Sequence, residues 1–212
     1  MSPRTPRQYE EIREEKRALI MDTALLFFAN EGYHSTTISQ IASYAGISKG
    51  LMYNYFKSKE DLLKAIISKS IAEVYNYFDI NRDGYLSEEE FEFFIRKIGI
   101  MLKEKRTFWR LLIQLMMQNE VRDQFLKSFV GSDSVDSIYL SANPDQRAAQ
   151  IINAIRDYFF RKKDSMGIAY DPMVEINLFI INLKGLALTV TYLEGDDESH
   201  DKVINRIIEL FK

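Results

Sequence analysis

Apolar residues recur every three or four positions over most of this 212-residue chain, which is the spacing of amphipathic helices. The first such pattern predicts a long helix from about Gln8 to Asn30, ended by Glu31-Gly32. Its buried stripe would consist of Ile12, Leu19, Ile20, Thr23, Ala24, Phe27 and Phe28. We expect an all-α protein.

Two short helices are predicted between residues 36 and 56. Thr36 or Thr37 can cap the first, whose apolar face would carry Ile38, Ile41, Ala42 and Ala45. Gly46 should stop it, because glycine tolerates positive φ, and Ser48 should cap the second. Two short helices joined by a glycine-containing turn indicate a helix-turn-helix, whose second helix enters the DNA major groove. The alternative is an ordinary helical hairpin on the surface.

Further helices are expected along the rest of the chain. One should run from Lys59 to Phe78, and another should bury Phe91, Phe94, Ile95 and Ile98. Met52 and Phe56, which precede Lys59, are expected to face the core of the N-terminal domain. The apolar segment 108–117 is predicted to be buried on nearly all sides. Three more helices are predicted from about Asn143 to Lys163, from Asp171-Pro172 to Leu193, and from His200 to Phe211.

The distribution of charge is more informative than its total. The net charge is −3, yet residues 34–59 contain no acidic side chain although the chain has 31 of them. Lys49, Lys57 and Lys59 lie in this segment, which suits contact with DNA phosphates. The absence of cysteine excludes disulfides and thiolate chemistry. No signal peptide and no uninterrupted apolar run of about 18 residues is evident, so we expect a cytoplasmic protein without a membrane partner.

Several motifs of the N-terminal part agree in spacing with one known family. They are Gly32-Tyr33, Thr36-Thr37, Ile41-Ala42, Ala45-Gly46-Ile47-Ser48, Gly50, Tyr53, Tyr55-Phe56 and Lys59-Glu60-Asp61-Leu62. Together they resemble the DNA-binding domain of TetR-type transcriptional regulators, over roughly Arg7 to Ile71. The resemblance implies a three-helix domain in residues 1–71 and a helical bundle for ligand binding and dimerisation in residues 72–212.

The same resemblance implies which residues face DNA. They are Thr37, Ser39, Ser48, Lys49, Gly50, Leu51, Tyr53, Asn54 and Lys59. Among them Lys49 can donate to a guanine edge, while Tyr53 and Lys59 suit phosphate contacts. It further implies a homodimer on palindromic operator DNA and a small-molecule effector of unknown identity, with the last two helices at the dimer interface.

An acidic segment follows the helix expected to end at Phe78. Residues 79–90 read D-x-N-x-D-G-x5-E, the pattern of an EF-hand calcium loop. The side chains of Asp79, Asn81 and Asp83, the carbonyl of Tyr85, and Ser87 and Glu90 would supply oxygen ligands. Gly84 would make the sharp turn. The cation would be Ca²⁺, with Mg²⁺ as the alternative, and no organic cofactor is predicted.

A purely structural reading of this segment stays open. Ser87 and Glu90 also fit a capping box for the following helix, in a loop that is only a polar connection. If a cation does bind, it could fix the bend after the preceding helix and so bias DNA affinity.

Candidate chemistry elsewhere in the chain is sparse. The histidines are His34 and His200, and neither lies in a nucleophile or phosphate-loop motif, so no enzyme is expected. Trp109, Met116 and Met117 either line an effector pocket or belong to the core. The sequence therefore favours a DNA-binding regulator, which by resemblance would be a repressor, over the alternative of a calcium sensor or buffer built on one EF-hand.

Overall fold

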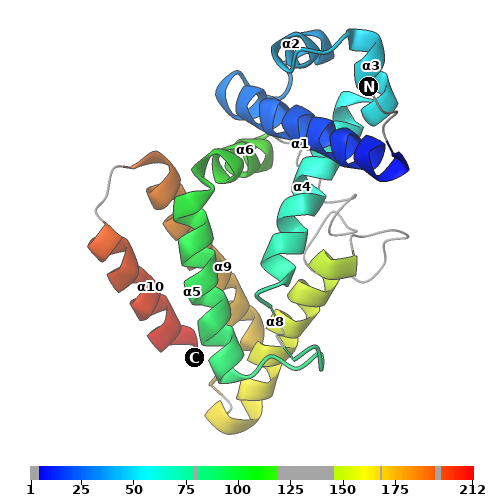
Figure 1. Ribbon diagram of the computed structural model, residues 1–212. Helices are drawn as coiled ribbons and strands as arrows, with labels where there is room; N and C mark the ends of the chain where they lie inside the picture. Colours follow the sequence, from blue (N-terminus) through cyan, green and yellow to red (C-terminus); the bar gives the residue numbers. More distant parts are fainter. Residues whose placement is uncertain (1–4, 79–80, 119–145, 168, 194–196) are drawn as a thin grey trace. The chain divides into compact units, whose positions relative to one another are not determined.

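The structure, a computed structural model, describes residues 5–78, 81–118, 146–167, 169–193 and 197–212 (Figure 1). Every regular element in these ranges is a helix. They are α1 (Pro6–Asn30), α2 (Ile38–Tyr44), α3 (Lys49–Tyr55), α4 (Lys59–Tyr75), α5 (Glu88–Glu104), α6 (Arg106–Met117), α8 (Gln146–Met166), α9 (Pro172–Tyr192) and α10 (Asp197–Phe211). The all-α prediction is confirmed.

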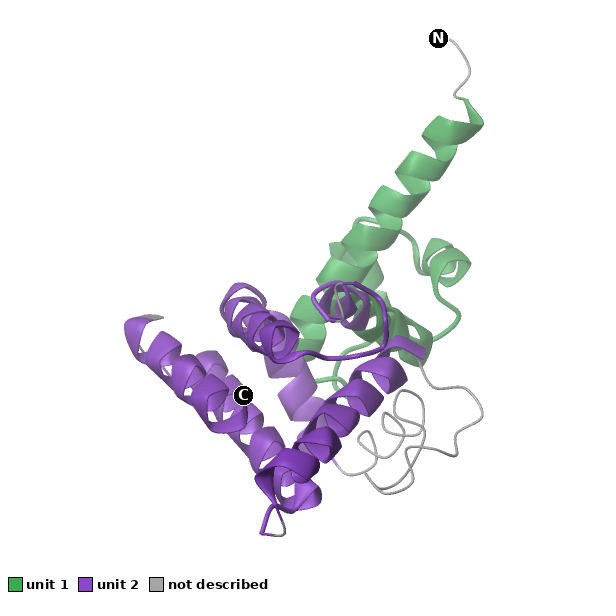
Figure 2. Cartoon of the chain, turned by 90° about the horizontal axis from the view of Figure 1, so that it is seen from below, with its two compact units in different colours: residues 1–69 green, residues 70–212 purple. Residues whose placement is uncertain are grey.

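The chain divides into two compact units, residues 1–69 and residues 70–212 (Figure 2). The division falls within α4, two residues before the boundary expected from the sequence. The first unit contains α1, α2 and α3 with the start of α4, and the second contains the remaining helices.

The first unit is built around the C-terminal half of α1. Thr5 caps this helix through a reciprocal pair of bonds with Gln8, and Pro6 occupies the first turn, where its missing N–H costs nothing. The helix therefore starts two residues earlier than predicted. Most of the expected stripe is buried, but Leu19 is 42% exposed, and Met21 and Ala29 are buried instead. Helical spacing identifies a face only to within one neighbouring position, which explains this error.

The second unit is packed around a cluster of aromatic rings. Phe91 of α5 stacks on Tyr158 of α8 with ring centroids 4.4 Å apart. Phe159, Phe179 and Phe211 meet edge-on or tilted beside them, so that α5, α8, α9 and α10 share one core. The four residues predicted to be buried on α5 are all in this core or at its edge.

Two expectations about the helices were wrong in the described residues, namely where α4 ends and how completely α6 is buried. Helix α4 ends at Tyr75 rather than Phe78, which is buried in the turn that follows. Helix α6 is buried along one face only, at Phe108, Leu111 and Leu115, whereas Met117 is 75% exposed. An apolar composition does not ensure that neighbours cover every side of a helix.

Helix α9 has apolar residues on two faces. Ile176, Phe179, Leu186 and Val190 are buried, while a second stripe is exposed and consists of Val174, Leu178, Ile181, Leu188 and Tyr192. By length and composition alone this helix is apolar enough to cross a membrane, although Glu175 and Lys184 interrupt its apolar residues. Its contacts with α5, α6, α8 and α10 account for the buried face and leave the exposed stripe without a covering element in the described residues.

Candidate nucleic-acid interface

Helix α2 begins with a complete capping box. Thr37 accepts a hydrogen bond from the backbone N–H of Gln40, and the Gln40 side chain accepts one from the backbone N–H of Thr37, at 2.8 Å. Thr36, the alternative cap, is instead fully buried and donates its hydroxyl hydrogen to the carbonyls of Gly32 and Phe27. The choice between the two threonines, which the sequence left open, therefore falls on Thr37.

The turn after α2 has the geometry that the sequence predicts. Gly46 has φ +67°, in the left-handed region that side chains with a Cβ disfavour. Ser48 then caps α3 by accepting from the N–H of Leu51 at 3.1 Å. Met52 and Phe56 are buried, so the opposite side of α3 faces outward.

The residues expected to face DNA share one property, which is exposure. Eight of the nine are exposed: Thr37, Ser39, Ser48, Lys49, Gly50, Leu51, Tyr53 and Asn54. They lie at the start of α2 and at the start of and along α3, and neither helix contains an acidic residue. This arrangement offers hydroxyl, amide and ammonium groups together with an aromatic ring, which suits both phosphate and base contacts. Their contact with DNA stays a prediction.

Lys59 differs from the other eight residues. It is half-buried, and its Nζ donates to the carbonyl oxygens of Tyr33, Thr36 and His34 at 2.8, 3.0 and 3.3 Å. The ammonium also lies 4.5 Å from the centre of the Tyr33 ring. Sequence reasoning missed this cluster, although Gly32-Tyr33 and Lys59 both belong to the motifs that carried the resemblance.

Tyr33 joins the same contacts from the other side. Its ring is 6% exposed and packs edge-on against Phe28 of α1. Its hydroxyl donates to Glu60 of α4 at 3.3 Å. Burial, and then the nearby Glu60 carboxylate, raise the pKa of Tyr33, which keeps the hydroxyl protonated as a donor.

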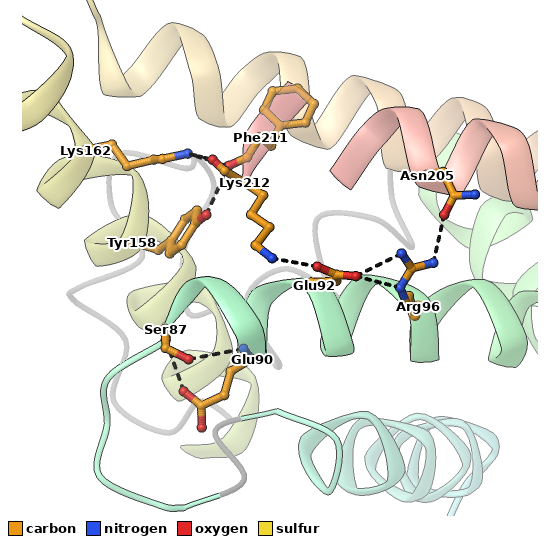
Figure 3. A network of polar contacts seen from close by, with 9 residues as sticks. All are labelled: Ser87, Glu90, Glu92, Arg96, Tyr158, Lys162, Asn205, Phe211 and Lys212. Atoms are coloured by element: carbon orange, nitrogen blue, oxygen red, sulfur yellow. Dashed lines mark hydrogen bonds and ion pairs between the residues drawn. The ribbon is translucent and has the colours of Figure 1, made fainter. Parts of the chain in front are cut away.

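The acidic segment is described from residue 81 onward, so Asp79 lies outside the described residues. Gly84 has φ +77°, as the sharp turn requires, and Leu86 is fully buried. Asp83 accepts from the Asn81 amide at 2.9 Å and from the N–H of Tyr85 at 2.7 Å. Ser87 and Glu90 form the capping box of α5, which Figure 3 shows. The structural reading of these two residues is therefore realised.

In the described residues, a side chain of α8 contacts this loop. Arg161 donates to the carbonyl of Leu86 at 2.6 Å, and its guanidinium lies 4.0 Å from the centre of the Tyr85 ring. In the part of the chain that the structure describes, no group of three or more His, Asp or Glu side chains is arranged to hold a metal. Asn81 Oδ1 accepts from the N–H of Asp83, and Glu90 Oε2 accepts from the N–H of Ser87.

The C-terminal end of α10 is held by a second network (Figure 3). Tyr158 and Lys162 of α8 donate to the carbonyl of Phe211 at 3.1 and 2.8 Å, and Lys212 pairs with Glu92 at 2.7 Å. Desolvation by burial lowers the pKa of Lys162. A cavity of about 680 Å³ adjoins this network and is lined by apolar residues such as Met166 and Leu178 together with charged ones.

The three residues predicted to line an effector pocket are not at this cavity. Trp109 is half-buried and donates its Nε1–H to the carbonyl of Met101 at 3.2 Å, which is an ordinary satisfied core position. Met116 is half-buried and Met117 is exposed at the end of α6. An effector pocket at these residues stays a prediction.

The geometry of α2, the Gly46 turn and α3 defines a helix-turn-helix domain of the DNA-binding class. Residues 20–66 match the family of bacterial regulatory proteins, tetR family. The N-terminal domain is therefore a TetR-type helix-turn-helix, as its motifs predict.

Two similar proteins match the chain over 127 and 61 residues. The chain is 30% identical over 127 residues to the uncharacterized HTH-type transcriptional regulator YerO of Bacillus subtilis (strain 168), covering 57% of this chain and 44% of that protein. It is 36% identical over 61 residues to a fatty acid metabolism regulator protein of the same organism, covering 29% and 31%. The aligned part thus spans less than half the length of these relatives.

Solved structures resemble the whole fold. The fatty acid degradation regulator FadR from Bacillus halodurans superimposes with a TM-score of 0.67 at 16% identity, covering 99% of this chain and 96% of that one. This likeness supports the architecture of an N-terminal helix-turn-helix domain followed by a helical C-terminal domain.

Proposed function

We propose that this chain is a homodimeric, one-component transcriptional regulator, a repressor that a small-molecule effector releases from double-stranded operator DNA. The observation that carries the proposal is the exposed, acid-free face of α2 and α3 within a domain that matches the tetR family. The relatives described above are transcriptional regulators, and we propose a non-enzymatic, cytoplasmic role of the same kind. A calcium sensor or buffer is not supported, because it leaves this domain without a function.

DNA selection tests the proposal. The wild-type protein should enrich specific sequences from a random duplex library, and a duplex of the enriched sequence should bind it in a gel shift. Tyr53→Ala removes an exposed side chain from α3. It should weaken that binding about tenfold or more, because the tyrosine is expected to contact the phosphate backbone of the DNA. Tyr77→Ala, at an exposed tyrosine of the second unit, is the matched control and should bind like wild type. No enrichment would overturn the proposal.

The exposed stripe on α9 supports the homodimer. Leu178, Ile181, Leu188 and Tyr192 repeat at helical spacing along it, with Gly185 between them. A Cβ added to Gly185 would meet nothing within 4 Å, so the surface is lowest at the centre of the stripe. A second copy of α9 could approach closely there. Two recognition helices about 34–36 Å apart would then read a palindromic site.

We further propose that residues 79–90 bind a divalent cation, Ca²⁺ or Mg²⁺. Support comes from the positive φ of Gly84, the buried Leu86, and the anchoring of the loop to α8 through Arg161. Glu90 would have to ligate the ion while its carboxylate still accepts from the N–H of Ser87. The ion would stabilise the segment between α4 and α5 and thereby bias DNA affinity.

One substitution separates the two roles of Glu90. Glu90→Gln keeps a side chain that can cap α5, because glutamine also fits the capping box, but it removes the negative charge that a cation needs. Calorimetry with millimolar calcium should give heat for wild type and for Glu89→Gln, the exposed neighbour, but not for Glu90→Gln. Identical heats for wild type and Glu90→Gln, or no heat at all, would contradict cation binding.

A further inference from the structure

Three backbone carbonyls converge on one lysine in the first unit. The Nζ of Lys59, the first residue of α4, lies 2.8, 3.3 and 3.0 Å from the carbonyl oxygens of Tyr33, His34 and Thr36. These carbonyls belong to the segment that joins α1 to α2. Residues 26 positions apart in the sequence are thus connected by a single ammonium group.

The geometry leaves this ammonium no donor to spare. A lysine ammonium has three N–H donors, and three carbonyls accept them. The ring of Tyr33 covers a further side at 4.5 Å. A phosphate contact by Lys59 would require at least one of these hydrogen bonds to break.

The position of Lys59 in its helix also needs an explanation. A positive charge in the first turn of a helix is unfavourable, because the helix dipole places positive partial charge there. Glu60 and Asp61, which follow it, have the favourable sign. The carbonyl cluster supplies the negative partial charges that offset the unfavourable position of Lys59.

The segment held by Lys59 leads directly into the predicted DNA surface. Thr36 is held by its own side chain as well, because its hydroxyl donates to the carbonyls of Gly32 and Phe27. The next residue, Thr37, caps α2 and is one of the exposed residues expected to face DNA. A shift of residues 33–36 would therefore displace Thr37 and the start of α2.

We infer that Lys59 is a positioning residue for DNA binding, which holds the α1–α2 segment and Thr37 in place and makes no phosphate contact of its own. This inference rests on the proposed DNA binding. The Lys59 side chain connects the start of α4 to the segment that leads into α2, so that a movement of this end of α4 would displace α2.

Salt dependence distinguishes positioning from phosphate contact. Each phosphate that a protein neutralises contributes about 0.9 to the slope of log affinity against log salt concentration. Loss of a phosphate-contacting lysine lowers that slope by about one per protomer, whereas loss of a positioning residue weakens binding at every salt concentration without changing the slope.

The experiment compares three variants on the duplex selected by the wild-type protein. Lys59→Met should lose about tenfold or more in affinity at an unchanged slope, because three carbonyls lose their partner. Lys59→Arg should lose affinity as well, because a planar guanidinium does not fit three carbonyls that converge on one point. Lys64→Met, at an exposed lysine of the same helix, controls for the loss of one charge and should bind like wild type.

Circular dichroism at the assay temperature should show all three variants folded. A role in stability alone would leave the affinity of the folded protein unchanged, so equal affinity of Lys59→Met and Lys64→Met would overturn the inference. A slope lowered by about 0.9 in Lys59→Met, or full affinity in Lys59→Arg, would also overturn it, since both indicate a phosphate contact.

A measurement on the wild-type protein covers the case in which the variants do not fold. With ¹⁵N-labelled lysine, the ammonium signal of Lys59 should be protected from exchange without DNA and should not shift when the duplex is added. An unprotected signal, or one that shifts with DNA, contradicts the inference while DNA binding itself stands. Failure of the wild-type protein to bind any duplex overturns the proposed function instead, and the inference with it.

Discussion

Two glycines four residues apart have opposite roles in the helix-turn-helix. Gly46 has φ +67° in the turn, whereas Gly50 lies within α3 and has no positive φ. A side chain at Gly46 is strained by the backbone conformation although nothing lies within 4 Å of a Cβ built there. At Gly50 the helical backbone accepts a Cβ, whose nearest neighbour would be the Ser48 Oγ at 4.0 Å.

This contrast gives a prediction for stability. Gly46→Ala should destabilise the protein by about 1–2 kcal/mol, because alanine resists the left-handed conformation. Gly50→Ala should stabilise the fold by about 0.5–1 kcal/mol, because glycine in a helix loses more conformational entropy than alanine. Urea unfolding of the two variants beside wild type measures both changes. Shifts of the same sign in the two variants would contradict the assigned backbone roles.

Individual residues differ in how far the sequence reveals them. Ser48 and Gly46 act on their own neighbours, so local pattern sufficed to predict the cap and the turn. The partners of Lys59 lie more than 20 residues away in the sequence, and the spacing of the motif does not predict that three carbonyls converge on this lysine. Sequence alone therefore placed this lysine at the DNA surface by resemblance, without its contacts.

At the scale of elements, a helix start marked by a capping residue and a proline is predictable from the sequence, whereas the end of α4, which has no such signal, was missed. Asp171 and Pro172 start α9 where the sequence indicates, since a cap and a first-turn proline are local signals. The close approach of α5 and α10 was not foreseen. A Cβ on Gly99 would lie 2.3 Å from Ile204 Cδ1, which shows that this glycine is needed for packing rather than for backbone freedom.

The exposed stripe on α9 makes a prediction about assembly. Ile181→Glu places a charge at a position that is 62% exposed in the single chain but buried in the proposed dimer, so it should shift the protein to monomer. Ile100→Glu, at an α5 position that is 45% exposed, should leave the mass unchanged. Light scattering at micromolar concentration measures both. A wild-type monomer, or equal behaviour of the two variants, would contradict the interface.

At the scale of the whole molecule, the two units differ in how specifically known proteins match them. The first unit is a TetR-type helix-turn-helix domain on sequence and geometry together. The second has the helical architecture of structures such as FadR, at 16% identity. Helical spacing reflects which face of each helix is buried, whereas a pocket depends on side chains brought together from distant segments, which is why spacing predicted its helices and not a pocket.

Titration of the selected duplex with wild-type protein at several salt concentrations tests the proposed function most directly. Fluorescence anisotropy should saturate at two chains per duplex, and log affinity should fall linearly with log salt concentration, because lysines of the helix-turn-helix neutralise phosphates on both half-sites. Binding that is absent, or that neither depends on salt nor saturates at a two-to-one ratio, would contradict a dimeric TetR-type regulator.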